Sequence, residues 1–290
     1  MGGYHGGTGR TIGIITLVVT AVLGSAYLLG RNLVPDPSQK DSAVTATGAD
    51  HPEYADQSAP SGADAVPDRP SVSPSPTPDR TDGPGSDPNF GPMGTQLSTG
   101  TGEVALTFDD GPNPDYTPQV LAILREYHVK ATFCVVGQNA QAYPWLVQQI
   151  VAEGHTLCNH SWDHDVGLGA RSPERIRDDL LRTNAAIRAA VPDAPIVWYR
   201  QPGGAWTYPV ISVSRDLGMT PLHWTLDPAD WQMPGATQIA SMVVAEVRPG
   251  SIVLLHDAGG DRQGTVNALY RILPELAGRF ELQALPNRGT

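Results

Sequence analysis

The chain has 290 residues and a formal net charge of −11, which allows one sizeable folded domain together with additional segments. The sequence contains no run of basic residues, and this argues against nucleic acid or another polyanion as the main partner. Residues 31–100 contain ten acidic and four basic residues, so they carry −6 of the net charge. Acidic residues in such a segment keep it solvated, as expected for a tether between two parts of a protein.

The first predicted element is an apolar helix at residues 11–30, which has no charged residue over twenty positions and is flanked by Arg10 and Arg31. Twenty helical residues rise about 30 Å, the thickness of the hydrocarbon core of a bilayer. Residues 1–31 are therefore expected to be a membrane anchor. The alternative is a signal peptide that is cut near Gly24-Ser25-Ala26, followed by secretion. Both interpretations place the rest of the chain outside the cytoplasm.

Residues 32–100 are predicted to be a disordered linker. They hold twelve of the 27 prolines and many Ser, Asp, Gly and Ala residues, without a sustained period of 2 or 3.6 residues. Such a segment cannot bury enough apolar area to offset the entropy lost on ordering. We expect an extended spacer that holds a folded domain away from the membrane.

Residues 101–290 are predicted to form one α/β domain, because short apolar runs alternate there with amphipathic stretches. The clearest amphipathic stretch is 173–190, where Ser172 and Pro173 provide the N-cap and the first turn of a helix. Alternating strands and helices imply parallel strands with helical crossovers, and seven strands predict a barrel or near-barrel shorter than a regular eight-fold one. The strand candidates are 103–108, 130–136, 155–159, 196–200, 220–224, 251–255 and 280–285.

Polar residues follow five of these strand candidates at their carboxyl ends. Such ends meet at one mouth of a barrel, where the chemistry of these folds takes place. We therefore expect the five clusters to surround a single site. They are Asp109-Asp110, His160 with His164, Arg200, Asp227 with Asp230-Trp231, and His256-Asp257.

The segment HSWDH at 160–164 predicts half of a metal site, because histidines four apart on a helical turn point the same way. One carboxylate of the pair Asp109-Asp110 would complete the site and leave coordination positions open, as in catalytic centres. Adjacent residues of an extended strand point in opposite directions, so the other carboxylate would be free to act as a base. The spacing does not say which is which. The alternatives are surface or core histidines and an acid pair that caps the turn at Gly111-Pro112.

Five motifs occur in a fixed order: TFDDGP at 107–112, HSWDH at 160–164, RQPGG at 200–204, DPADW at 227–231 and LLHD at 254–257. Together they resemble the motifs of the NodB-like polysaccharide deacetylases, carbohydrate esterase family 4, and the resemblance covers about residues 101–285. It implies a distorted, incomplete (β/α) barrel. It also implies an enzyme that removes acetyl groups from a polysaccharide.

The resemblance implies roles for the first three motifs. Asp109 would be the general base and Arg200 would orient it. Asp110, His160 and His164 would bind a divalent metal, which is usually zinc, with cobalt or another divalent ion in some members.

The resemblance also implies roles for the last two motifs. His256 would be the general acid, held by Asp230, and Trp231 and Leu254 would line the pocket for the acetyl methyl group.

The third motif departs from the family pattern Arg-x-Pro-aromatic-Gly, because Gly203 fills the aromatic position. Its N–H would still help to bind the oxyanion, but an aromatic wall beside the substrate is lost. Trp206 is a candidate replacement for that wall, and Trp162 is a candidate for stacking on sugar rings or for packing. His155 and Asn159 flank the metal segment and would either orient the ligands or simply pack.

Cys134 and Cys158 fall on neighbouring strand candidates. In an oxidising compartment they would form either a disulfide or two buried free thiols, depending on whether their registers match.

A membrane tether, a long spacer and an outward-facing domain suit a cell-wall polymer. We expect N-acetylated amino sugars of peptidoglycan as the substrate, chitooligosaccharides second and acetylxylan third, and we expect a monomer. The rival interpretation from another class is a non-catalytic domain that binds cell-wall glycan. A metallopeptidase is disfavoured, because Ser161 and Trp162 stand where His-Glu-x-x-His would need its glutamate.

Overall fold

The computed structural model describes residues 1–2 and 87–287. The predicted anchor and most of the predicted linker lie outside these residues, so both stay predictions. In the part of the chain that is described, no helix has the length and apolar character needed to cross a bilayer. The end of the predicted linker is described, and it contacts the folded domain. Thr95 and Gln96 are buried there, and Gln96 pairs with Leu222.

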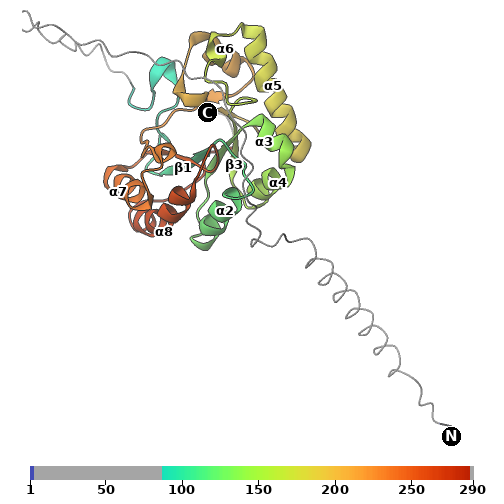
Figure 1. The fold of residues 1–290 in the computed structure, drawn as a ribbon, viewed down its shortest axis with the longest axis vertical. Coiled ribbons are helices and arrows are strands. Elements are labelled where there is room, and N and C mark those ends of the chain that lie inside the picture. The colour runs from blue at the N-terminus through green and yellow to red at the C-terminus, as the bar shows by residue number, and fades with distance from the viewer. Residues whose placement is uncertain (3–86, 288–290) are drawn as a thin grey trace, which may run out of the picture. The chain divides into compact units, whose positions relative to one another are not determined.

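The folded part is built on a six-stranded parallel sheet with the order β5-β4-β3-β2-β1-β6 (Figure 1). Six of the seven predicted strands are present. The seventh is wrong, because residues 280–285 make only an isolated parallel bridge between Leu282 and Val104. The strands are β1 Ala105–Asp109, β2 Thr132–Val135, β3 Thr156–Asn159, β4 Trp198–Tyr199, β5 Thr220–Pro221 and β6 Ile252–His256.

The two edges of this sheet come together through the chain that follows β5. Leu226 pairs with Val253 of β6, and the amide of Leu254 donates to the carbonyl oxygen of Leu226 at 2.9 Å. The barrel is closed at this point only by a few residues rather than by a full ladder. This arrangement agrees with a distorted, incomplete barrel.

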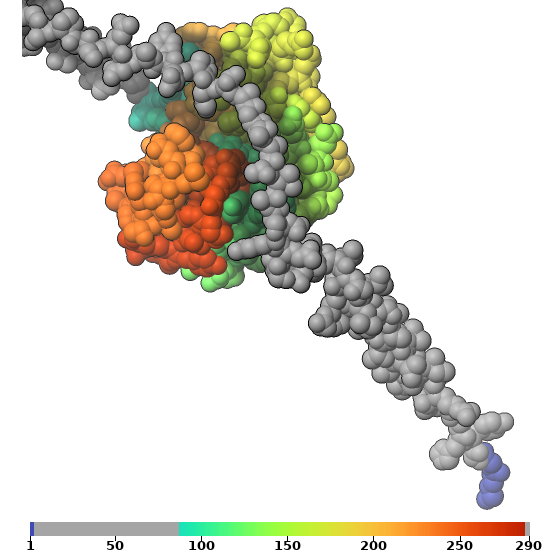
Figure 2. Space-filling view, in the orientation of Figure 1, coloured from blue at the N-terminus to red at the C-terminus, as the bar shows by residue number. Residues whose placement is uncertain are grey.

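Helices surround the sheet, and at least one helix lies between each strand and the next, as the alternating pattern predicts (Figure 1). In the space-filling view, the orange and red segments that include α7 and α8 form one side of the domain, and yellow α5 lies on the other (Figure 2). The N-cap predicted for α5 is present, since Ser172 Oγ accepts a hydrogen bond from the Arg175 amide. The helices are α2 Thr117–Glu126, α3 Gly137–Ala142, α4 Pro144–Ala152, α5 Pro173–Ala190, α6 Tyr208–Asp216, α7 Ala236–Glu246 and α8 Gln263–Ala277.

Residues of β1 alternate between two environments, as expected for a strand whose side chains point to opposite faces. Leu106 and Phe108 belong to the large core shared with the helices. Ala105 belongs to a second, smaller cluster inside the barrel, and Thr107 and Asp109 follow it on that face. Inward-pointing residues near the carboxyl end of the strand are therefore the ones that can reach a site at the mouth.

Cys134 and Cys158 form a disulfide inside the barrel. They are register partners on β2 and β3, with their Cα atoms 4.1 Å apart. Residues in register on adjacent parallel strands point to the same face, which is the condition that a bridge requires. The disulfide alternative therefore holds.

Candidate active site

A cavity of about 420 Å³ opens at the carboxyl ends of the strands. Side chains from four of the five sequence clusters line this cavity. The fifth cluster, Arg200, lies directly behind its wall. Arg200 and Asp230 are buried behind the wall, and each is bonded to a residue that lines it. The lining residues are Asp109, Asp110, His160, His164, Gln201, Gly203, Trp224, Asp227, Trp231, Leu254, His256, Gly259 and Arg262.

Asp110, His160 and His164 form a candidate metal centre, with one ligand atom from each lying within 4.8 Å of the others. Asp110 Oδ1 is 3.4 Å from His160 Nε2 and 3.2 Å from His164 Nε2. Among the described residues, this buried oxygen has no hydrogen-bond donor with suitable geometry. One carboxylate oxygen and two imidazole nitrogens suit a divalent cation such as zinc and leave room for further ligands. The residues therefore fit a metal.

The charges at this centre favour an ionised Asp110. Burial alone would raise the pKa of its carboxyl group. The facing His160 imidazole, together with His256 and His164, outweighs burial and lowers that pKa to about 2. The carboxylate is thus ready to act as a ligand at neutral pH.

The two histidines converge through an irregular loop, and the predicted helical turn at 160–164 is wrong. Ser161 and His164 have left-handed backbone angles, with φ of 63° and 60°. Asn159 Oδ1 accepts from the Ser161 amide at 2.9 Å and fixes the first bend. Asn159 therefore shapes the metal segment, one of the two roles considered for it.

The strand argument for separating the two carboxylates is also wrong. β1 ends at Asp109, and Asp110 turns into the left-handed region with φ of 75°. Both side chains consequently face the cavity. Asp109 Oδ2 lies 3.6 Å and Asp110 Oδ1 lies 3.4 Å from the same His160 Nε2 atom.

Asp109 is held by Arg200, whose Nη1 lies 2.7 Å from Asp109 Oδ1. Arg200 is fully buried, and it also donates to Thr107 Oγ1 and to the carbonyl oxygens of Leu222 and His223. A guanidinium fixed by several bonds leaves the carboxylate one well-defined orientation. The other oxygen of Asp109, Oδ2, points towards His160 and the cavity.

His256 lies beside Asp109 because the two residues are register partners on adjacent strands β6 and β1. Its Nδ1 is 2.7 Å from Asp230 Oδ1, and Asp230 Oδ2 accepts from the His256 amide and from Thr265 Oγ1. Burial would lower the pKa of the imidazole. The hydrogen bond and charge of Asp230, with Asp109 and Asp110, raise that pKa to about 8. His256 is therefore protonated at neutral pH.

The site thus has a candidate metal triad, an acid held by an arginine, and a histidine held by an acid. Residues 96–222 match the sequence profile of the family described as "Polysaccharide deacetylase". A chitooligosaccharide deacetylase of Sinorhizobium fredii is 43% identical over 199 residues, which cover 65% of this chain and 92% of that protein. The chain belongs to the polysaccharide deacetylase family.

Two further relatives of this polysaccharide deacetylase family member support the assignment. A peptidoglycan-N-acetylglucosamine deacetylase of Bacillus cereus is 42% identical over 175 residues, covering 60% of this chain and 81% of that protein. A crystal structure of a peptidoglycan N-acetylglucosamine deacetylase superposes with a TM-score of 0.63 at 32% identity, covering 67% of this chain and 91% of that chain. The family and enzyme class predicted from the motifs are confirmed.

One aromatic side chain of this family member differs from the expectation. Trp206 does not line the cavity: it is buried and donates from Nε1 to His223 Nδ1 at 3.2 Å. Trp162 is also buried, beneath Arg182, and does not line the cavity, so the packing alternative holds for it. The lining tryptophans are Trp224 and the half-exposed Trp231.

His155 is not an orienting residue for the metal ligands. It precedes β3 at the amino end of the strand, the opposite end from the site, and its Nδ1 accepts from the Ala131 amide at 3.1 Å. Burial lowers the pKa of this imidazole to about 4. Its role is packing, which was the alternative.

Sequence reasoning missed Gly259 and Arg262. Arg262 is buried and donates to the carbonyl oxygens of Ala258, Gly259 and Asp261. It thereby holds Gly259, which has a φ of 75°, directly against Asp110 Oδ2, where a Cβ atom would collide. The adjacent glycines at 259 and 260 were the only sequence signal for this close approach.

Proposed function

We propose that this protein is a metal-dependent deacetylase that hydrolyses the acetamido group of N-acetylated amino sugars in an extracellular polysaccharide, with peptidoglycan as the substrate. The observation that carries the proposal is the convergence of three units on one cavity. These are the triad of Asp110, His160 and His164, the pair Asp109–Arg200, and the pair His256–Asp230.

The triad would hold the metal, and zinc is the proposed ion because the ligands are one carboxylate and two imidazoles. A divalent cation there would supply Lewis-acid polarisation of the acetyl carbonyl and acidify water. The His160 Nδ1 atom lies 2.8 Å from the Arg200 carbonyl oxygen. Donation of the Nδ1 proton to that oxygen leaves the Nε2 lone pair free for the cation.

Asp109 would take the proton from the attacking water. Its Oδ1 is occupied by Arg200, so Oδ2, which faces His160, is the oxygen available for this task. A carboxylate fixed in this way needs no reorientation before proton transfer.

His256 would give its proton to the sugar amine as the bond between that nitrogen and the acetyl carbon breaks. Amines are poor leaving groups unless protonated, so an acid is required on this side of the reacting carbon. Asp230 accepts a hydrogen bond from Nδ1–H of His256, and the Nε2 proton of the charged ring is left for transfer. Because the pKa of His256 is about 8, that proton is present at neutral pH.

Three further lining residues would bind the acetyl group. The N–H of Gly203 would donate to the oxyanion, and Trp231 with Leu254 would enclose the methyl group. These roles follow the family resemblance, and the position of all three residues on the cavity supports them.

Peptidoglycan is proposed for two reasons. One relative is named for peptidoglycan N-acetylglucosamine, and the apolar residues 11–30 with the Pro-rich linker suit an enzyme tethered outside the cytoplasmic membrane. We propose this location, with secretion after cleavage as the alternative. A chitooligosaccharide is the second candidate substrate, because the relative that is 43% identical carries that name. Acetylxylan, an ester, is the third.

The test is acetate release from peptidoglycan, chitopentaose and acetylxylan side by side, with free amines counted on the products. Each substrate is assayed with native protein, with chelator, and with zinc or cobalt restored. Release that is lost with chelator and restored by metal supports the proposal, and the preferred polymer identifies the substrate. No release from any polymer in the presence of metal would favour the glycan-binding alternative.

A further inference from the structure

Beside one part of the cavity, two consecutive residues are glycines, and the first of them lines the cavity. Gly203 and Gly204, in the short helix η3 Pro202–Gly204, have left-handed φ angles of 61° and 62°. A Cβ atom built on Gly203 would meet only the methyl groups of Val166, at 3.3 and 3.6 Å. The cavity is therefore open beside residue 203, and no wall arises from that residue.

Trp224 packs beside this gap. A Cβ atom on Gly204 would lie 2.7 Å from Trp224 Cη2, so the edge of the indole is seated where residue 204 has no side chain. The ring is partly exposed and lines the same cavity as Gly203 and His256. Gly204 is thus the residue that lets the indole reach this position.

The indole is held firmly by its surroundings. It packs on the cluster inside the barrel, and its ring centroid is 4.1 Å from that of His223. Arg200 donates to the carbonyl oxygens of Leu222 and His223, the two residues that precede it. The arginine that orients Asp109 therefore also fixes the backbone that carries Trp224.

We propose that Trp224 is a specificity-determining residue whose indole forms the apolar wall against which the pyranose ring of the acetylated sugar packs. Large rigid aromatic faces provide contact area at little entropic cost, and the C–H face of a pyranose is apolar. This inference rests on the proposed function. Trp224 would recognise the sugar ring, whereas Gly203, Trp231 and Leu254 would bind the acetyl group.

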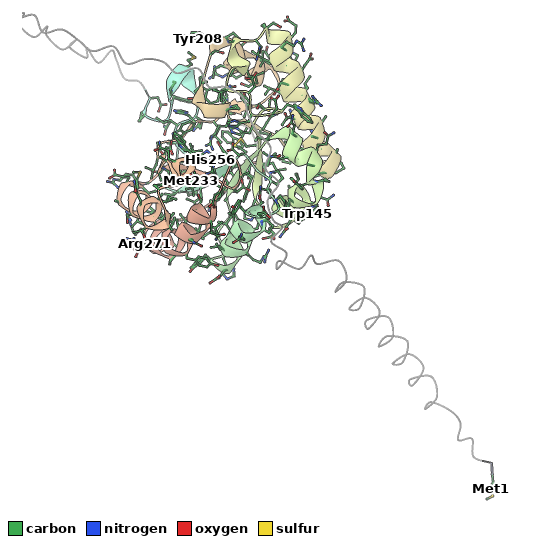
Figure 3. The ribbon with its side chains drawn as sticks, in the orientation of Figure 1. Met1, Trp145, Tyr208, Met233, His256 and Arg271 are labelled. Atoms are coloured by element: carbon green, nitrogen blue, oxygen red, sulfur yellow. A yellow bond between two sulfur atoms is a disulfide. The ribbon has the colours of Figure 1, made fainter. Side chains whose placement is uncertain are left out.

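The experiment compares a substrate that has a sugar ring with one that has none. Initial rates on chitopentaose and on vinyl acetate are measured for the metal-loaded wild type and for Trp224→Ala, Trp224→Phe and Trp145→Ala. Trp145, on α4, is half exposed and lies away from His256 (Figure 3), so it is the matched control.

Trp224→Ala should raise KM for chitopentaose roughly ten-fold, the effect of losing a stacking contact together with its buried area. Trp224→Phe should recover most of that loss, and the kcat/KM for vinyl acetate should change less than about two-fold in either variant. Trp145→Ala should match the wild type on both substrates.

An unchanged KM for chitopentaose in Trp224→Ala would overturn the proposal. So would an equal loss on both substrates, because a merely structural indole would disturb the catalytic groups for every substrate. If the wild type hydrolyses no acetyl substrate at all, the proposed function fails and calorimetric titration with chitopentaose decides the role of Trp224. Weaker binding by Trp224→Ala than by the wild type would then support the wall, whereas equal binding or no binding by either protein would exclude it.

Discussion

The backbone carbonyl oxygen of Arg200 lies 2.8 Å from His160 Nδ1, while the guanidinium of the same residue lies 2.7 Å from Asp109 Oδ1. One residue therefore fixes both the tautomer of a proposed metal ligand and the orientation of the proposed base. This is possible because β4 lies beside β3, so that Arg200, directly after Tyr199, stands next to His160, directly after Asn159. The proposed metal ligand His160 and the proposed base Asp109 are consequently both positioned by Arg200.

Asp109→Asn should separate proton transfer from metal binding. The amide cannot accept the proton from water, and we expect kcat to fall by roughly 10²–10⁴-fold. The triad of Asp110, His160 and His164 is left intact, so the zinc content measured by atomic emission should match that of the wild type.

His160→Ala is the comparison variant, and it should lose both zinc and acetate release because a ligand is removed. If Asp109→Asn remained fully active, the base would have to be another residue.

The pH dependence of deacetylation should show an alkaline limb near pH 8. The pKa of His256 is raised above its ordinary value to about 8. A general acid works only while protonated, so its contribution is complete below this pKa and is lost as the pH rises through it. Asp230→Asn removes the charge that raises the pKa, so the limb of the kcat profile should move to lower pH. A limb that stays near pH 8 in this variant would assign it to some other group.

The arrangement of strands was largely predictable, because a helix separates each strand from the next and a polar cluster follows five of the six strands. The seventh strand was overcounted. Residues 280–285 have a similar composition, but only Val104 offers them main-chain pairing. Composition indicates that a segment can form a strand, but it does not show whether an adjacent strand has free backbone groups to pair with it.

The site could be predicted as a set of residues but not as a geometry. The two histidines of 160–164 converge through residues with left-handed backbone angles rather than on a helix. One bend depends on a hydrogen bond from the backbone amide of Trp162 to the carboxylate of Asp179, which is distant in sequence. Trp206, the candidate for the missing aromatic wall, is absent from the cavity for a similar reason. Which indole reaches the cavity depends on the path of the chain after β5, and local sequence does not encode that path.

Gly259→Ala should weaken metal binding although no proposed ligand is replaced. The new Cβ would collide with Asp110 Oδ2 and push the carboxylate away from His160 and His164. Displacing a ligand through its neighbours typically costs 10–100-fold in metal affinity. We expect a loss of roughly that size in zinc competition with a fluorescent chelator.

Gly218→Ala is a matched control for the backbone strain, since Gly218 has a φ of 76° and a Cβ there would meet nothing within 4 Å. It should lose some stability and keep wild-type zinc affinity. Equal zinc affinities in the Gly259 and Gly218 variants would show that the contact between Gly259 and Asp110 does not position the ligand.

Removal of the disulfide should lower stability more than activity. Cys134 and Cys158 are 24 residues apart, and a cross-link closing a loop of that size stabilises a protein by about 3 kcal/mol through the unfolded chain. The double variant Cys134→Ala/Cys158→Ala should therefore show a lower urea midpoint, and reductant should change its curve no further.

The effect of the bridge on activity should be small although it lies close to the site. Cys134 is in register with Asp109, and Cys158 precedes His160 by two residues, so the bridge lies directly beneath the site. The β1–β2 and β2–β3 ladders also hold these strands, so at temperatures below unfolding the kcat of the double variant should stay within about two-fold of the wild type. A large loss of kcat in fully folded protein would instead make the bridge part of the positioning of Asp109.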